Sequence, residues 1–207
     1  MIMKKNILLY VLSLIWSSTL LAQSIEKGYH GFVDAGYSVK LGTNTASTNW
    51  VEFNTVHGYQ INPYFFAGAG VGVQLAEKMN YGDISGRPYM KRNKSTEIPI
   101  FADLRYTILN KKVTPFIEAR FGHYVTSGSG PYLSGGVGCR IDFGIGALNV
   151  KVAYTEYKFK YEELDLITTY KLMKVGYSYI NMPELSYRYH DFKKNSNSLT
   201  FTVGYEF

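Results

Sequence analysis

Charged side chains recur at alternate positions in four segments of the sequence, and they are the residues with the clearest capacity for chemistry. Alternate residues of an extended segment share one face, so seven charges would gather on one side of a sheet: Asp103, Arg105, Glu118, Arg120, Arg140, Asp142 and Lys151. Such charges can pair across strands or line an ion-selective constriction. Because an unpaired buried charge is costly, we expect them to pair.

The polar link between two of these segments sets the expected partners. If Lys111-Lys112 is a two-residue link, Arg105 lies opposite Glu118 and Asp103 lies opposite Arg120, which gives two complementary cross-strand pairs. The favoured interpretation is a salt-bridged interior that rigidifies the fold. The alternative is a gated or ion-selective constriction.

The four histidines do not form a catalytic pattern. A barrel lipase or deacylase would place a serine two residues after a histidine, but that spacing holds only Phe32, Tyr59, Val125 and Phe192. His190 and Asp191 are adjacent, so they would point to opposite faces of a strand. No Cys/His metal spacing is present, and the single Cys139 is interpreted as a small outward-facing hydrophobe. We therefore expect no enzyme, no metal and no cofactor, and a lipid-modifying enzyme is the least favoured alternative.

The elements that carry these charges are strands with one apolar and one polar face. Asn197–Phe207 shows this best, because Leu199, Phe201, Val203, Tyr205 and Phe207 alternate with polar residues and glycine. In an outer-membrane barrel the apolar face of such a strand meets lipid and the polar face lines the lumen. Seven other segments alternate in the same way: Tyr29–Leu41, Trp50–Ile61, Phe65–Leu75, Glu97–Ile108, Ile117–Val125, Leu133–Phe143 and Leu148–Thr155. We expect an all-β protein, a transmembrane antiparallel up-and-down barrel.

The segment Lys158–Asn197 leaves the number of strands open. It contains two further alternating runs, and a single extra crossing would place the C-terminus on the wrong side. Either both runs cross, which gives ten strands, or both form one tall outer hairpin, which gives eight. The turn signal at Pro183 and the compact Lys193–Asn197 link slightly favour ten.

The beginning of the chain predicts export. Lys4 and Lys5 precede the apolar run Ile7–Leu21, and Ala22-Gln23 offers a cleavage point, so residues 1–23 are expected to be a signal peptide and residues 24–207 one barrel domain. No later run approaches the ~18 apolar residues of a membrane helix. The net charge of +6 is modest, and no basic cluster interleaved with aromatic residues indicates nucleic-acid binding.

Three runs carry a family resemblance: TVHGYQINPYFFAGAGVGVQL, EIPIFADLRYTILNKKVTPFIEARFGHYV and SGGVGCRIDF, with the ending FTVGYEF. The chain resembles the outer-membrane beta-barrel, or "porin family", proteins of Bacteroidetes. The resemblance implies a barrel in the outer membrane of a Gram-negative bacterium. It implies contact with outer-membrane lipid, and Tyr205 and Phe207 resemble the signal that the barrel-assembly machinery reads. It does not imply an activity. Independently, the short links Asn62-Pro63, Asn110–Lys112 and Gly144–Ala147 alternate with mostly longer ones, and this asymmetry predicts both termini in the periplasm.

A basic loop is the last candidate site. Ala76–Thr96 would lie outside the cell, where cations can bind lipopolysaccharide phosphates, and the candidate contacts are Lys78, Arg87, Lys91, Arg92 and Lys94. A solvated charged loop is the alternative.

The sequence as a whole favours a structural, adhesive or surface-interaction role with the extracellular ligand undetermined. The second hypothesis is a narrow pore for small solutes.

Overall fold

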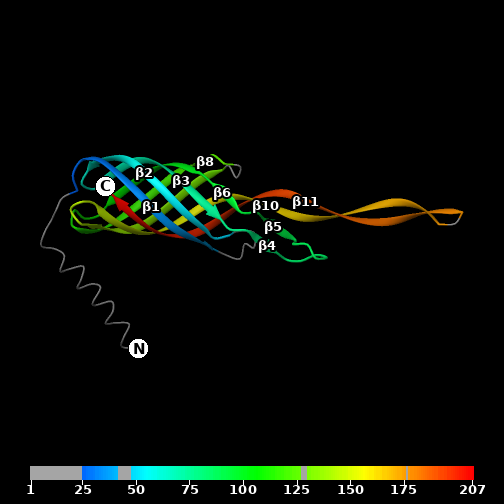
Figure 1. The fold of residues 1–207 in the computed structure, drawn as a ribbon. Helices are drawn as coiled ribbons and strands as arrows, with labels where there is room; N and C mark the ends of the chain where they lie inside the picture. The colour runs from blue at the N-terminus through cyan, green and yellow to red at the C-terminus, as the bar shows by residue number, and fades with distance from the viewer. Residues whose placement is uncertain (1–24, 42–47, 127–129, 176) are drawn as a thin grey trace, which may run out of the picture.

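A closed antiparallel barrel forms the body of the protein (Figure 1). The computed structural model describes residues 25–41, 48–126, 130–175 and 177–207, and the expected signal peptide lies outside the described residues. Eleven strands occur in this part of the chain: β1 (Gly28–Leu41), β2 (Trp50–Asn62), β3 (Phe65–Ala76), β4 (Met79–Tyr81), β5 (Met90–Arg92), β6 (Ser95–Glu97), β7 (Pro99–Thr107), β8 (Val113–Tyr124), β9 (Pro131–Asp142), β10 (Ala147–Val175) and β11 (Ser178–Glu206). The prediction of an all-β barrel is confirmed.

Eight of these strands make the ring. Their order is β11-β1-β2-β3-β7-β8-β9-β10, and β10 also pairs with β11, which closes the ring. The short strands β4, β5 and β6 follow β3, where β6 extends the pairing of β3 and β4–β5 forms a small hairpin against β10. The slightly favoured count of ten strands is therefore wrong, and the alternative of eight is correct.

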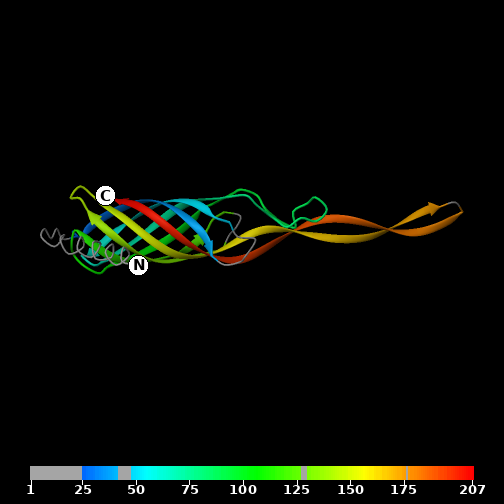
Figure 2. The same ribbon diagram turned by 90° about the horizontal axis from the view of Figure 1, so that it is seen from below.

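The segment expected to hold two extra crossings continues the last two barrel strands instead. β10 and β11 stay in one register, without a shift, from Ala147↔Glu206 to Val175↔Ser178. β10 pairs with β9 only as far as Glu156, and β11 pairs with β1 only beyond Asn197. Residues 157–196 therefore leave the barrel as a two-stranded hairpin, here called the outer ribbon. The 19 residues of β10 after Glu156 span about 60 Å at ~3.3 Å per residue, and the ribbon points away from the barrel (Figures 1 and 2).

Alternation along the strands produces an apolar outer wall and a polar lumen. In β1, Val33, Tyr37 and Val39 are exposed, whereas Asp34 and Ser38 are buried in the interior. The same pattern continues around the ring, where the exposed apolar residues include Phe53, Val73, Ile100, Ile117, Phe121, Leu133, Val137, Val150, Phe201 and Val203. Apolar side chains thus cover the outside, whereas the interior holds polar side chains together with a set of buried aromatic rings.

The two ends of the barrel differ. Short links join β2 to β3, β7 to β8 and β9 to β10 at the end where β11 terminates (Figure 1). Long links and the outer ribbon lie at the opposite end. We call these the short-turn end and the ribbon end. No helix in the described ranges is long and apolar enough to cross a membrane.

Candidate functional site

A network of buried charges crosses the lumen. Arg105 Nη2 lies 2.6 Å from Glu118 Oε2, and Arg120 Nε lies 2.8 Å from Asp103 Oδ2. Both expected cross-strand pairs are therefore present, in the expected register, with Asp103↔Arg120 and Arg105↔Glu118 opposed. Lys151 Nζ joins them from β10 at 2.6 Å from Glu118 Oε1. All five side chains are at most 6% exposed.

Asp34 on β1 completes the network from the opposite wall. Its Oδ2 accepts from Arg120 Nη2 at 2.6 Å and from Lys151 Nζ at 3.2 Å. Within this network, as described, Asp34, Asp103 and Glu118 balance the charges of Arg105, Arg120 and Lys151. Asp34 is not among the seven lumenal charges predicted from the sequence. Charge balance with short contacts is what makes burial of six ionic groups tolerable.

Aromatic rings pack against the network inside the barrel. The Arg105 guanidinium lies between two phenylalanines, 4.1 Å from the Phe32 ring centroid and 4.5 Å from that of Phe116, and such cation–π stacking adds to the pairing. Phe32 packs edge-on against Phe66 at 5.0 Å. Toward the ribbon end the lumen is filled by a further group of buried rings: Phe101, Tyr124, Tyr132, Trp50 and Tyr157.

A further buried carboxylate lies within this aromatic layer. Glu52 is 3% exposed and accepts from Trp50 Nε1 at 3.2 Å, Asn54 Nδ2 at 3.1 Å and Gln74 Nε2 at 3.2 Å. Tyr124 in turn donates to Gln74 Oε1 at 3.0 Å. This chain of hydrogen bonds ties β2, β3 and β8 together across the part of the lumen nearer the ribbon end.

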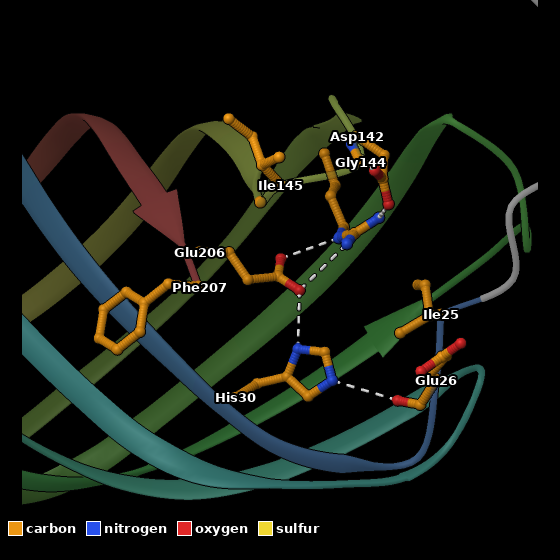
Figure 3. A pocket seen from close by; sticks show the side chains of 10 residues that line it. Ile25, Glu26, His30, Asp142, Gly144, Ile145, Glu206 and Phe207 are labelled. Carbon is orange, nitrogen blue, oxygen red and sulfur yellow. Dashed lines mark hydrogen bonds and ion pairs between the residues drawn. The ribbon is translucent and has the colours of Figure 1, made fainter.

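The other two predicted lumenal charges lie at the short-turn end, around a small pocket (Figure 3). Arg140 Nε lies 2.8 Å from Glu206 Oε2, and its Nη1 lies 2.9 Å from Asp142 Oδ2. His30 Nδ1 lies 3.0 Å from the other oxygen of Glu206. The pocket has a volume of about 290 Å³. These ion pairs tie β1, β9 and β11 together at this end of the barrel.

The remaining histidines are separated from one another. His57 lies on the outer wall and bonds to Tyr29, whereas His123 bonds to a backbone carbonyl. His190 Nε2 lies 3.6 Å from Asp165 Oδ2 across the outer ribbon, where both side chains are exposed. Within the described ranges, no group of three or more His, Cys, Asp and Glu side chains is arranged to hold a metal ion. Cys139 is half-buried on the outer wall.

The basic loop folds onto the base of the outer ribbon. Lys91 Nζ lies 2.9 Å from Glu162 Oε2 and 3.6 Å from the Tyr189 ring centroid, and Arg87 lies over the Tyr187 ring at 5.0 Å. Arg92 is buried and donates to Ser95 Oγ at 2.9 Å. Lys78 and Lys94 are exposed. Of the five candidate lipopolysaccharide contacts, Arg92 is therefore not accessible on the surface and Lys91 is engaged with the ribbon.

Tyr89 links this loop to β10. Its carbonyl accepts from the Leu164 backbone N–H at 2.8 Å, and its hydroxyl donates to Glu163. The hydrogen bond to the Glu163 carboxylate raises the pKa of Tyr89. The loop therefore acts as a third strand over the first residues of the ribbon and ends where Leu164 is buried.

The two faces of the outer ribbon differ in polarity beyond this point. One face carries residues that the register sets opposite one another in the pairs Leu166↔Tyr187, Thr168↔Leu185, Tyr170↔Pro183 and Leu172↔Asn181. Exposure on this face reaches 51% at Leu166, 71% at Tyr170 and 62% at Leu172. The other face carries charged and polar pairs, among them Asp165↔Arg188 and Thr169↔Glu184. An apolar face without a partner is unusual for a two-stranded hairpin in water.

Comparison with known proteins adds no family to this picture. No protein-family model matches the chain, and no curated protein matches it. The fold and the arrangement of these residues therefore carry the functional argument.

Proposed function

We propose that this protein is an outer-membrane barrel with a closed, salt-bridged lumen that presents the outer ribbon for interaction at the cell surface. The apolar wall supports a membrane location, because exposed Val, Ile, Leu and Phe side chains surround the ring and lipid is the solvent that such a band requires. The short-turn end would face the periplasm and the ribbon end would face outside, as in barrels with short periplasmic turns and long outer loops.

The observation that carries the proposal is the combination of a filled lumen with a long ribbon. Phe32, Phe66, Phe116 and Tyr132 are at most 2% exposed, and the balanced charge network lies among them. A barrel that conducts needs a continuous polar path, and these layers occupy the lumen. The ribbon, in contrast, extends a hydrogen-bonded scaffold with exposed apolar residues into solvent, as an interaction element would.

Site-specific labelling on intact cells tests the orientation. In a Cys139→Ser background, Tyr177→Cys at the fully exposed ribbon tip should react with a membrane-impermeant maleimide. Ile145→Cys, which is 89% exposed at the short-turn end, is the matched control and should react only after the outer membrane is permeabilised. Labelling of position 145 and protection of position 177 on intact cells would reverse the orientation.

Conductance in planar bilayers tests the closed lumen against the alternative of a narrow pore. The wild-type barrel should show conductance near zero, and Arg105→Ala should raise it because the substitution removes the side chain that joins Glu118, Phe32 and Phe116. Steady wild-type conductance that Arg105→Ala leaves unchanged would favour the pore.

A further inference from the structure

The base of the outer ribbon carries a cluster of lysines, here called the basic collar. The collar covers the first five pairs beyond the barrel, from Tyr157↔Ser196 to Tyr161↔Phe192. No acidic residue occurs in these two short segments, but four lysines do: Lys158, Lys160, Lys193 and Lys194. Three of the four are exposed, and Lys158 is half-buried. Positive charge is therefore concentrated where the ribbon leaves the barrel.

Two of these lysines are opposed in the strand register. Lys160 on β10 lies directly opposite Lys193 on β11, and like charges at opposed positions destabilise a sheet. The next pair on this face is Glu162↔Asp191, but Glu162 binds Lys91 at 2.9 Å. Within the part of the chain that the structure describes, none of the collar lysines forms an ion pair. An anion from outside the protein that lies between the two ammonium groups would offset their repulsion.

A pocket lies beside the collar, between β10 and the segment that joins β5 to β6. Its volume is about 240 Å³, and both Lys94 and Lys160 line it. Two of its three acidic residues bind cations of β5, and the third is Asp191. Among the described residues, neither Lys94 nor Lys160 forms an ion pair. The pocket can therefore offer two ammonium groups to a small anion.

The collar lies just beyond the edge of the apolar wall. Tyr154↔Leu199 is the last apolar pair on the outer face of β10 and β11, and β9 stops pairing with β10 at Glu156. Since the proposed function puts this wall in lipid, the residues that follow lie at the level of the lipid headgroups. Phe192 is 41% exposed and stacks on Tyr161 with ring centroids 5.9 Å apart, and aromatic residues are typical of that level.

Resting on the proposed location of the barrel in an outer membrane, we propose that the basic collar and its pocket bind phosphate groups of the lipids around the barrel. A phosphomonoester carries about −1.5 to −2 charges at neutral pH, so it can contact several ammonium groups at once, whereas a zwitterionic headgroup brings a cation of its own. The ligand is a lipid whose headgroup bears phosphomonoesters, as lipid A does. Of the five loop cations expected to contact lipopolysaccharide, Lys94 is the one that lines this pocket without an ion pair.

Native mass spectrometry of the purified barrel in detergent tests the ligand. The two probes are lipid A and the same lipid after removal of its phosphates. Wild-type protein should prefer lipid A, and the affinity should fall about fivefold for each lysine removed in Lys160→Gln/Lys193→Gln. The control Lys111→Gln/Lys112→Gln removes the same charge at the short-turn end and should bind as wild type does. Equal binding of the two probes, or wild-type affinity of Lys160→Gln/Lys193→Gln, would overturn the proposal.

Asp191 allows a test in the opposite direction. Its carboxylate lines the pocket and repels an anion there, so Asp191→Asn should raise the affinity for lipid A by about fivefold. Without lipid, Lys160→Gln should not lower the urea concentration at which the barrel unfolds, because it removes a like-charge pair. An affinity of Asp191→Asn at or below that of wild type would exclude the pocket as the phosphate site.

Inorganic phosphate distinguishes the two sources of the same chemistry. Lipid A should stay bound when millimolar inorganic phosphate is added, and displacement by the free ion would overturn the assignment to a lipid. Labelling on cells separates this inference from the proposed function. If position 177 is labelled on intact cells but lipid A does not bind, the inference fails and the surface role stands. If lipid A binds in detergent but position 177 is protected on cells, the proposed orientation fails.

Discussion

Arg105 is the residue on which the lumenal network depends most. Its guanidinium contacts Glu118 at 2.6 Å and stacks between Phe32 and Phe116. Glu118 keeps Arg120 Nε at 2.8 Å and Lys151 Nζ at 2.6 Å in this variant. Arg105→Ala nevertheless leaves three buried carboxylates with two cations, and an uncompensated buried charge costs about 3–5 kcal/mol. The double variant Arg105→Ala/Glu118→Ala removes that stranded charge. We expect the single variant to lower the free energy of unfolding, measured by urea titration in lipid vesicles, more than the double variant does.

Lys151 also contacts Glu118, so it affects the stability of the single and double variants differently. Lys151 remains bound to Glu118 at 2.6 Å in the Arg105→Ala variant, but in the double variant its remaining carboxylate is Asp34 at 3.2 Å. Arg105→Ala with Glu118→Gln keeps the volume of the side chain at 118 and serves as the control. Greater stability of Arg105→Ala than of both double variants would contradict a paired network.

Part of this network could be predicted from the sequence, and the reason is local. Arg105 and Glu118 are separated by one short link, so the link length fixes their register. Asp34 meets Arg120 across the lumen, and the two are 86 residues apart in the sequence, so no register argument connects their strands, which are not neighbours. Glu206 and Arg140 are 66 residues apart, and the same limit applies. Contacts across a barrel depend on its radius and therefore on the number of strands.

At the scale of the strand, inside and outside alternate with each residue, so position decides the effect of a charge. Val137 on β9 is 63% exposed on the outer wall, whereas Ser134 faces inward and accepts from Thr155 Oγ1 at 3.0 Å. Val137→Arg should cost about 2–4 kcal/mol if the wall faces the bilayer midplane, and Ser134→Asn should cost much less. Unfolding titrations in lipid vesicles measure both, and equal losses would contradict a lipid-facing position for Val137.

The outer ribbon shows why the strand number was mispredicted. Alternation within Lys158–Asn197 correctly predicts strands, but Pro183 in the sequence favours a turn between two membrane crossings. Pro183 in fact lies within β11 on the ribbon edge, where its missing N–H leaves the β10–β11 ladder intact. Alternation identifies a strand but not its partner or its length. The continuous register from the barrel to the tip could not be read from a pattern of period two.

Excision of the ribbon tests whether barrel and ribbon are separate units. Joining Leu164 to Tyr189 through Asn-Gly, a favoured hairpin turn, removes residues 165–188. It keeps the contacts of Lys91 and Tyr89 with β10 and Tyr189, and it removes the contact of Arg87 with Tyr187. The pairing of β9 with β10 ends at Glu156 of β10, and the pairing of β1 with β11 begins at Asn197 of β11. The excision therefore leaves both pairings in place. We expect native heat-modifiable migration of the shortened protein, because the pairings that close the barrel are retained. Failure of this variant to fold would show that the ribbon contributes to the barrel.

The whole molecule has three zones along one axis. The short-turn end holds an ion-paired mouth, and the barrel holds a charged and aromatic interior. The ribbon leaves the opposite end of the barrel (Figures 1 and 2). The mouth and the interior use polar residues to fix strands to one another. The ribbon consists of the extensions of β10 and β11, and it has an apolar face and an unpaired strand edge beyond the barrel wall. β11 takes part in all three zones, because it closes the barrel, supplies Glu206 and forms half of the ribbon.

Closure of the ring depends on the last residues of β11. Phe207 exchanges two backbone hydrogen bonds with Gly31, at 3.0 and 2.9 Å, and its ring lies over Gly31 so closely that an added Cβ would be 2.5 Å away. Glu206 binds Arg140 and His30. Deletion of Tyr205–Phe207 removes these contacts and opens the seam between β1 and β11, and unpaired backbone at a seam is very costly in lipid.

We therefore expect the truncated chain to fail to assemble, with no heat-modifiable band in the membrane fraction. The ribbon excision variant is the control, because it removes 24 residues, 165–188, without touching the seam. Gly31→Leu supplies an independent test, since its side chain would displace the Phe207 ring while every residue of β11 is retained. It should weaken closure, seen as unfolding at lower urea concentration. Native migration of the truncated protein, together with wild-type stability of Gly31→Leu, would contradict this. The β1–β11 pairs from Asp34↔Gly204 to Leu41↔Asn197 would then be sufficient to hold the seam.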